Sequence, residues 1–240
     1  MSKIKPIEIW DLPLRLFHWL LVLFIIAAYI LGNLGGVYLE WHIHAGIVIL
    51  SLLAFRLVWG FVGSTHSRFR HFVPSFPRLY AYLLSPKPVL GHSPLAALWI
   101  IVILLLLLFC SASGLFSVDD EIGIEGPFSR FVTSSWNQSL TGIHFILQNL
   151  IQFFVALHLI AIAFYLAVKG NNLLLPMVTG KSYVQGTNEI ASITRNGRLP
   201  VCIALGVSIS VFCLIESVVW LERVAPLPDK AQPNIHVPIW

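Results

Sequence analysis

Long apolar runs separated by polar connections dominate the pattern of the chain. Five stretches are almost wholly apolar, and they cover residues 14–35, 41–62, 94–116, 143–168 and 200–220. A helix needs about 20 apolar residues to cross the ~30 Å of hydrocarbon in a bilayer. The pattern therefore predicts an all-α integral membrane protein with five transmembrane helices.

Basic residues gather in the connections on one side of these helices. Eleven of the 15 Lys and Arg residues lie on the side of the N-terminus, three lie on the other side, and Arg56 lies inside the second stretch. Loops rich in Lys and Arg stay in the cytoplasm. We therefore expect a cytoplasmic N-terminus, an uncleaved first helix and, after five spans, a C-terminal tail on the outer side.

Composition narrows the class of protein further. Hydrophobic residues make up 57% of the chain and charged residues 11%, against about 25% charged residues in a soluble domain. This composition excludes a water-soluble fold, and it points to lipid and not to nucleic acid as the surroundings. The three cysteines lie in apolar segments without a CxxC or CxxCH motif, so disulfides, structural zinc and covalently attached haem are not expected.

Four histidines lie in or at the ends of the apolar stretches, where an imidazole is costly unless it has a function. His144 and His158 are 14 residues apart, which places them on one helix face about 21 Å apart along the axis. By depth, His42 pairs with His144 near the outer surface, and His18 pairs with His158 near the inner surface. This pattern predicts two bis-histidine haem sites stacked across the bilayer.

Depth alone leaves His42 and His44 as alternatives, because they differ by about 200° around their helix. His42 is favoured because Arg56 lies 14 residues later on the same face, where it could meet a propionate of the inner haem. Arg15 lies one turn before His18 and suits the same role. Taken singly, each histidine could instead make a hydrogen bond between helices.

Several motifs resemble one family. They are Trp-Asp-Leu-Pro-Leu-Arg-Leu-Phe-His-Trp at 10–19, His-x-x-x-Gly at 42–46, Arg-Leu-Val-Trp-Gly at 56–60, Leu-Gly-His-Ser-Pro-Leu at 90–95, Glu-Gly-Pro at 125–127 and Asn172 to Lys181. Together they resemble the bacterial cytochrome b561 family, in the branch of the b-type cytochrome subunit of nickel-iron hydrogenases.

The resemblance implies a four-helix core with two non-covalent b haems, whose axial ligands fall on His18, His42, His144 and His158. It divides the chain into a dihaem domain at 1–182 and a remainder at 183–240. That remainder comprises a cytoplasmic linker, the fifth helix and the outer tail.

The resemblance also implies electron transfer in the bacterial inner membrane, between a quinone pool and an outer redox partner such as a hydrogenase or a c-type cytochrome. An acidic outer loop would attract a basic partner; its carboxylates are Asp119, Asp120, Glu121 and Glu125. Exchangeable quinone is expected at the cytoplasmic rim, which carries Arg15, Arg56, Lys169 and Asn172. We expect an electron-transfer subunit and not an independent catalyst, as a homodimer or part of a larger complex.

Two alternatives belong to other classes of protein. The first is an enzyme that oxidises superoxide or another small outer molecule and reduces quinone, which would need a basic outer pocket. The second is a haem-free membrane scaffold or metal transporter that uses the same histidines.

Overall fold

The computed structural model describes residues 5–85, 93–184 and 197–224. Five helices in these parts are long and apolar enough to cross a membrane, as predicted. They are α1 (Leu12–Leu34), α2 (Tyr38–Val62), α5 (Pro94–Gly114), α6 (Ser134–Ala167) and α8 (Arg198–Val224). The prediction of an all-α membrane fold is confirmed.

The helix ends follow from local chemistry. The Asp11 side chain accepts a hydrogen bond from the Leu14 amide at 2.8 Å and caps α1, which has a proline in its first turn. At the other end, Gly35 and Gly36 take φ values of 63° and 56°, which glycine adopts without a steric penalty. These two glycines turn the chain directly into α2.

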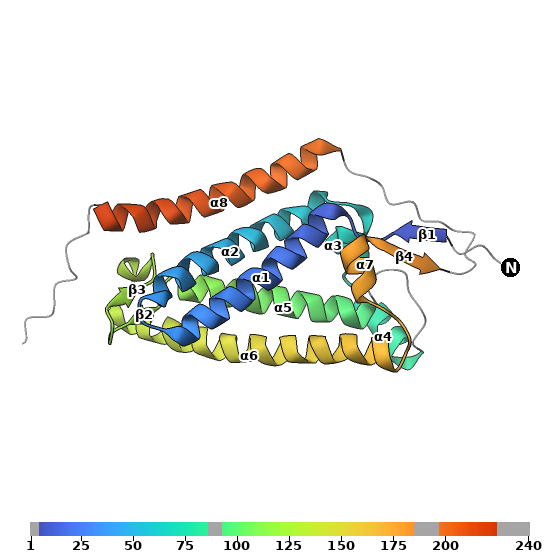
Figure 1. Ribbon diagram of the computed structural model, residues 1–240, viewed down its shortest axis with the longest axis horizontal. Coiled ribbons are helices and arrows are strands. Elements are labelled where there is room, and N and C mark those ends of the chain that lie inside the picture. Colours follow the sequence, from blue (N-terminus) through green and yellow to red (C-terminus); the bar gives the residue numbers. More distant parts are fainter. Residues whose placement is uncertain (1–4, 86–92, 185–196, 225–240) are drawn as a thin grey trace, which may run out of the picture.

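Four long helices form a bundle, and the fifth lies outside it (Figure 1). The helices α1, α2, α5 and α6 run side by side, while α8 lies along α2. With 34 residues, α6 is about 51 Å long, so it extends well beyond the ~30 Å of hydrocarbon. It begins at Ser134, nine residues before the predicted start of the fourth span.

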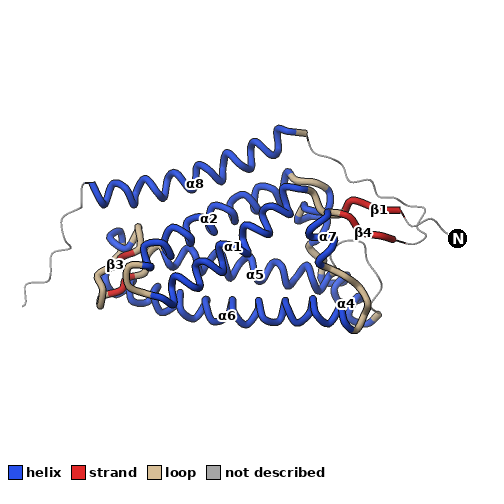
Figure 2. Tube along the Cα trace, in the orientation of Figure 1, coloured by secondary structure: helices blue, strands red, loops and turns tan. Residues whose placement is uncertain are grey.

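The two ends of the bundle carry different short elements, as Figure 2 shows. At the end where α1 begins, hereafter the N-terminal end, lie α3 (Phe69–Phe72), α4 (Phe76–Leu84) and α7 (Leu174–Thr179). At the opposite end, β2 (Val118–Asp119) pairs antiparallel with β3 (Ile124–Glu125). Two 3-10 turns, η1 (Thr65–Ser67) and η2 (Ser129–Phe131), complete the connections.

A small sheet at the N-terminal end was not predicted. The strand β1 (Lys5–Glu8) pairs antiparallel with β4 (Lys181–Val184), with Glu8 opposite Lys181. The Gly180 carbonyl accepts hydrogen bonds from the amides of Ile9 and Trp10 at 2.8 and 3.2 Å. This sheet joins the start of the chain to the segment that follows α6.

Candidate functional site

His42 and His144 face each other at the opposite end of the bundle. Their ring centroids are 6.0 Å apart and the rings are nearly perpendicular, at 88°. A metal held between two imidazoles, with each nitrogen about 2 Å away as in other imidazole–metal bonds, separates the ring centres by about 6 Å. The spacing therefore fits two axial ligands of one iron.

Hydrogen bonds fix the orientation of both rings. The Nδ1 atom of His42 lies 2.8 Å from the Ala28 carbonyl oxygen in α1. The Nδ1 atom of His144 lies 2.9 Å from the Cys110 carbonyl oxygen in α5. A carbonyl can only accept, so each Nδ1 carries the proton and donates, which leaves the lone pair on Nε2. That is the tautomer, and the supporting contact, that metal-binding histidines use.

Glycines give these rings their space. A Cβ atom added at Gly32 would lie 2.9 Å from the His42 Nδ1 atom, and one added at Gly114 would lie 2.9 Å from the His144 Cε1 atom. A larger residue at either position would push the imidazole away from its carbonyl. Gly46, one turn after His42, has no atom within 4 Å of such a Cβ, which leaves room beside the ligand for a flat cofactor.

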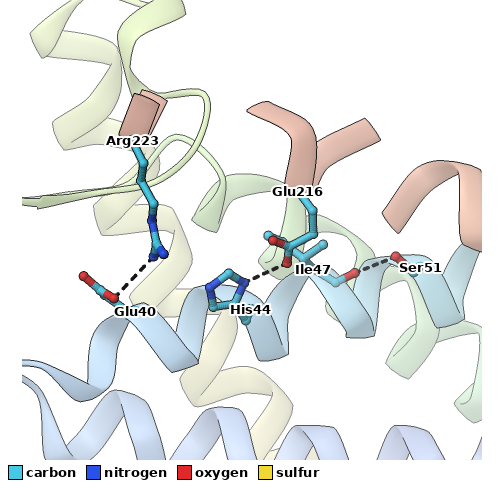
Figure 3. A network of polar contacts seen from close by, with 6 residues as sticks. All are labelled: Glu40, His44, Ile47, Ser51, Glu216 and Arg223. Carbon is cyan, nitrogen blue, oxygen red and sulfur yellow. Dashed lines mark hydrogen bonds and ion pairs between the residues drawn. The ribbon is translucent and has the colours of Figure 1, made fainter. Parts of the chain in front are cut away.

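His44 points in another direction. Its Nδ1 atom lies 2.7 Å from the Glu216 Oε1 atom in α8 (Figure 3). Of the two histidines that the sequence left as alternatives, His42 faces α1 and α6, and His44 faces α8. The hydrophobic pattern of the sequence did not indicate this contact.

At the N-terminal end, His18 on α1 lies near His158 on α6. The His18 Nδ1 atom is buried and has no hydrogen-bond partner. The Arg15 Nε atom and the Trp99 Nε1 atom are also buried without a partner. Buried polar atoms are nearly always paired, so three such atoms at one end indicate a missing group that carries acceptors. Haem propionates would supply acceptor oxygens there.

Arg15 and Trp99, which lie at the same end as His18 and His158, each contact a neighbouring residue. Arg15 donates from Nη1 to the Val178 carbonyl at 2.5 Å, and a Cβ at Gly180 would lie 3.2 Å from the guanidinium. Trp99 in α5 packs against Phe154 in α6 with ring centroids 4.8 Å apart. Because Phe154 precedes His158 by one turn, Trp99 lies on the side of the bundle that carries this ligand. Trp99 was not predicted from the sequence.

The described contacts of Arg56 are with protein groups, and its contact with a propionate stays a prediction. Its side chain is buried, with 4% exposed, and Nη1 donates to the Ser67 carbonyl at 3.2 Å. The guanidinium carbon lies 4.8 Å from the Phe69 ring centre and 5.5 Å from that of Phe72. The segment after α2 folds back over Arg56, so these cation–π contacts assign it a role in holding α3.

The other polar side chains that the sequence pointed to form hydrogen bonds or are exposed. The Asn172 Oδ1 atom accepts from the amides of Leu174 and Leu175, each at 3.0 Å, and starts α7. Lys169 is exposed at the same end. In the loop between α5 and α6, Glu125 accepts from the Ser129 hydroxyl at 2.6 Å.

The chain is similar to known proteins of one family. The family described as "Prokaryotic cytochrome b561" matches residues 9–180. The "Probable Ni/Fe-hydrogenase 1 B-type cytochrome subunit" of Escherichia coli (strain K12) is 28% identical over 155 residues, which cover 52% of this chain and 66% of that protein.

A second relative covers more of the chain. The "Probable Ni/Fe-hydrogenase B-type cytochrome subunit" of Rhizobium leguminosarum bv. viciae is 24% identical over 200 residues, 69% of this chain and 82% of that protein. The match to the E. coli protein spans slightly less than two thirds of its length. No solved structure matches the chain.

Proposed function

Because the chain belongs to the prokaryotic cytochrome b561 family, we propose that it carries electrons across the bacterial inner membrane through two b haems. His42 and His144 would hold one haem, and His18 and His158 would hold the other. A b-type cytochrome implies haem b, and five apolar helices make this a multi-pass membrane protein. The haem count, the ligands and the direction across the membrane are parts of the proposal.

The paired rings of His42 and His144 carry this proposal. Their 6.0 Å spacing fits one metal between them, and their two Nδ1 hydrogen bonds to carbonyls leave both Nε2 lone pairs free to bind it. Two histidine ligands on a haem iron would leave no open coordination position for a substrate. Such a site supports electron transfer and not catalysis at the metal.

Each group around the haems has a role of its own. Haem supplies reversible one-electron chemistry when it is bound. Arg15 lies one turn before His18, and its unpaired Nε is available to donate to a propionate. Bonds between a guanidinium and a carboxylate are among the stronger hydrogen bonds in proteins. The contacts of Arg56 support a structural role, so we assign the propionate to Arg15.

The names of the relatives and the charge of the exposed carboxylates support the redox partners that we propose. The relatives are named as subunits of Ni/Fe-hydrogenases, and we propose a hydrogenase or a c-type cytochrome at the outer face. The exposed carboxylates Asp120, Glu121 and Glu125 would steer a basic surface to the opposite end of the bundle. Quinone would exchange at the N-terminal end, beside Arg15 and Lys169, with the N-terminus in the cytoplasm and the C-terminus outside.

The haem content of ligand variants tests the proposal. The dithionite-reduced spectrum and a pyridine haemochrome assay should give two b haems per wild-type chain and at most one in His144→Ala and in His158→Ala. The control His71→Ala removes an exposed histidine at the N-terminal end and should keep both haems. A wild-type protein without haem, or ligand variants that keep two haems, would overturn the assignment.

A further inference from the structure

We propose that α4 lies in the membrane surface at the N-terminal end and binds anionic phospholipids of that leaflet. An exposed apolar face of the helix inserts between the lipids, and arginines of α4 and α3 bind their phosphates. This lipid site is independent of the proposed electron path. It gives the connection between α2 and α5 a partner of its own.

The first observation is the apolar face of α4. None of its nine residues is buried. Four large apolar side chains are exposed, namely Phe76 (82%), Tyr80 (60%), Leu83 (58%) and Leu84 (70%). At about 100° per residue, these four lie within an arc of about 100° around the helix. A helix with its exposed apolar side chains on one side is typical of an element that lies in a membrane surface.

The second observation is the position of α4 beside a membrane-spanning helix. It contacts α5, and Figure 1 shows it at the end of the bundle where α5 begins. Since the apolar span of α5 starts there, at Pro94, α4 lies where the hydrocarbon meets the lipid headgroups. Leu79 and Tyr82 are less exposed than the rest of α4 and lie next to each other around the helix. Contact with the protein on their side leaves the apolar face uncovered.

The third observation is the charge beside this face. Residues 64–85 contain three arginines and no acidic residue. Arg70 in α3 and Arg78 in α4 are exposed, whereas Arg68 donates from Nε to the Gly63 carbonyl at 2.6 Å. Arg70 uses one of its N–H groups in a bond to the exposed His71 ring, at 3.1 Å. A guanidinium carries five such donors, so both exposed arginines can bind a phosphate.

These three observations together favour an anionic lipid over other partners. The apolar face lies at the depth of the headgroups, where lipid surrounds α5 on its outer side. An apolar face alone would fit any phospholipid, but the two exposed arginines without a neighbouring carboxylate in sequence select a negative surface. A guanidinium binds a phosphate through two parallel hydrogen bonds, and an anionic leaflet attracts each arginine near it.

Hydrogen exchange of the full-length protein in nanodiscs tests the proposal. Phosphatidylglycerol is the anionic probe, and discs of phosphatidylcholine alone are the reference. At low ionic strength, the backbone amides of α4 should exchange more slowly in discs that contain phosphatidylglycerol, by about fivefold for each of the two arginines. Equal exchange of α4 in the two kinds of disc would overturn the proposal. Fast exchange in both would point to a soluble partner instead.

Arginine variants test the selection of the anionic lipid. Arg70→Gln/Arg78→Gln removes both exposed charges, so α4 should exchange at the same rate in the two kinds of disc. Arg130→Gln/Arg223→Gln removes two arginines at the opposite end of the bundle and is the matched control, which should keep the wild-type difference. A lipid dependence that survives in Arg70→Gln/Arg78→Gln would overturn the proposed site.

A variant of the apolar face tests its insertion into the membrane. Phe76→Ala/Leu84→Ala removes two exposed side chains while alanine keeps a high helix propensity, so faster exchange of α4 in both kinds of disc would report lost contact with lipid. Phe131→Ala, at an exposed position of the opposite end (66%), is the control and should leave α4 unchanged. Unchanged exchange in Phe76→Ala/Leu84→Ala would mean that the face lies outside the membrane. The wild type in the two kinds of disc decides the proposal even if a variant does not fold.

Discussion

Replacement of Asp11 by alanine should loosen the N-terminal end of the bundle and release its haem first. The carboxylate accepts from the Leu14 amide at 2.8 Å, from the Trp59 indole at 3.2 Å and from the Ser67 hydroxyl at 2.9 Å, and Ser64 also donates to it. It therefore joins the first turn of α1 to the last turn of α2 and to η1.

The expected loss of stability is the sum of two lost interactions. Removal of an Asp cap costs about 1 kcal/mol of helix stability. Trp59 is only 1% exposed, so its indole N–H would be left buried and unpaired, at a cost of about 1–3 kcal/mol. The serines lose less, because Ser64 and Ser67 already contact each other at 3.0 Å. The variant should therefore be destabilised by about 2–4 kcal/mol.

Haem release during heating measures this effect. His18 lies seven residues after Asp11, two turns along α1, so movement of the first turn displaces that ligand. In Asp11→Ala, the haem of His18 and His158 should leave at a lower temperature than in the wild type. Asp11→Asn keeps a capping oxygen and should fall between the two. Asp119→Ala, which removes a turn acceptor in the loop between α5 and α6, is the control. An Asp11→Ala protein with wild-type haem retention would refute the reasoning.

Three further predictions concern other contacts. Glu216→Gln should weaken the attachment of α8 to α2 and lower the thermal stability while both haems are retained. The control Glu40→Gln, at an exposed ion pair, should change the stability by less than about 1 kcal/mol. Arg56→Gln should keep two haems but speed tryptic cleavage at Arg70, because α3 loses its cation–π contacts; loss of a haem would instead favour the propionate role. Burial, and next the charge of His71, lower the pKa of His66 below 6.5. The unfolded chain then binds the proton more tightly than the folded protein does. The contribution of His66 to stability is therefore full above about pH 6.5 and falls as the pH drops toward the folded pKa. His66→Gln should reduce the difference in proteolysis rate between pH 5 and pH 7.5.

The long helices could be predicted from the sequence because the bilayer imposes length and hydrophobicity on each span. The depths of His42 and His144 followed from the same constraint, and the structure brings these two rings together. Depth carries no information on rotation about the helix. For that reason the contact between His44 and Glu216 appeared only once α8 was placed against α2.

Other features depend on contacts between distant segments. The pairing of β1 with β4 joins residues more than 170 positions apart, and neither strand has an alternating pattern long enough to predict it. Gly32 and Gly114 look like ordinary membrane-helix glycines in the sequence. Their role is visible only from the imidazole that packs on each. The aromatic enclosure of Arg56 likewise requires the fold of the segment after α2, which the hydrophobic pattern does not specify.

The sheet of β1 and β4 also has a consequence for the biogenesis of the protein. The surroundings of His18 are completed by residues made much later, since Arg15 donates to the Val178 carbonyl and the Gly180 carbonyl accepts from Ile9 and Trp10. During synthesis, α1 therefore enters the membrane with the end that carries His18 still open. That end can close only after the ribosome has passed residue 184, when α6 has brought His158 into place. A haem held there, as we propose, would thus be enclosed late, once the four helices of the bundle have been inserted.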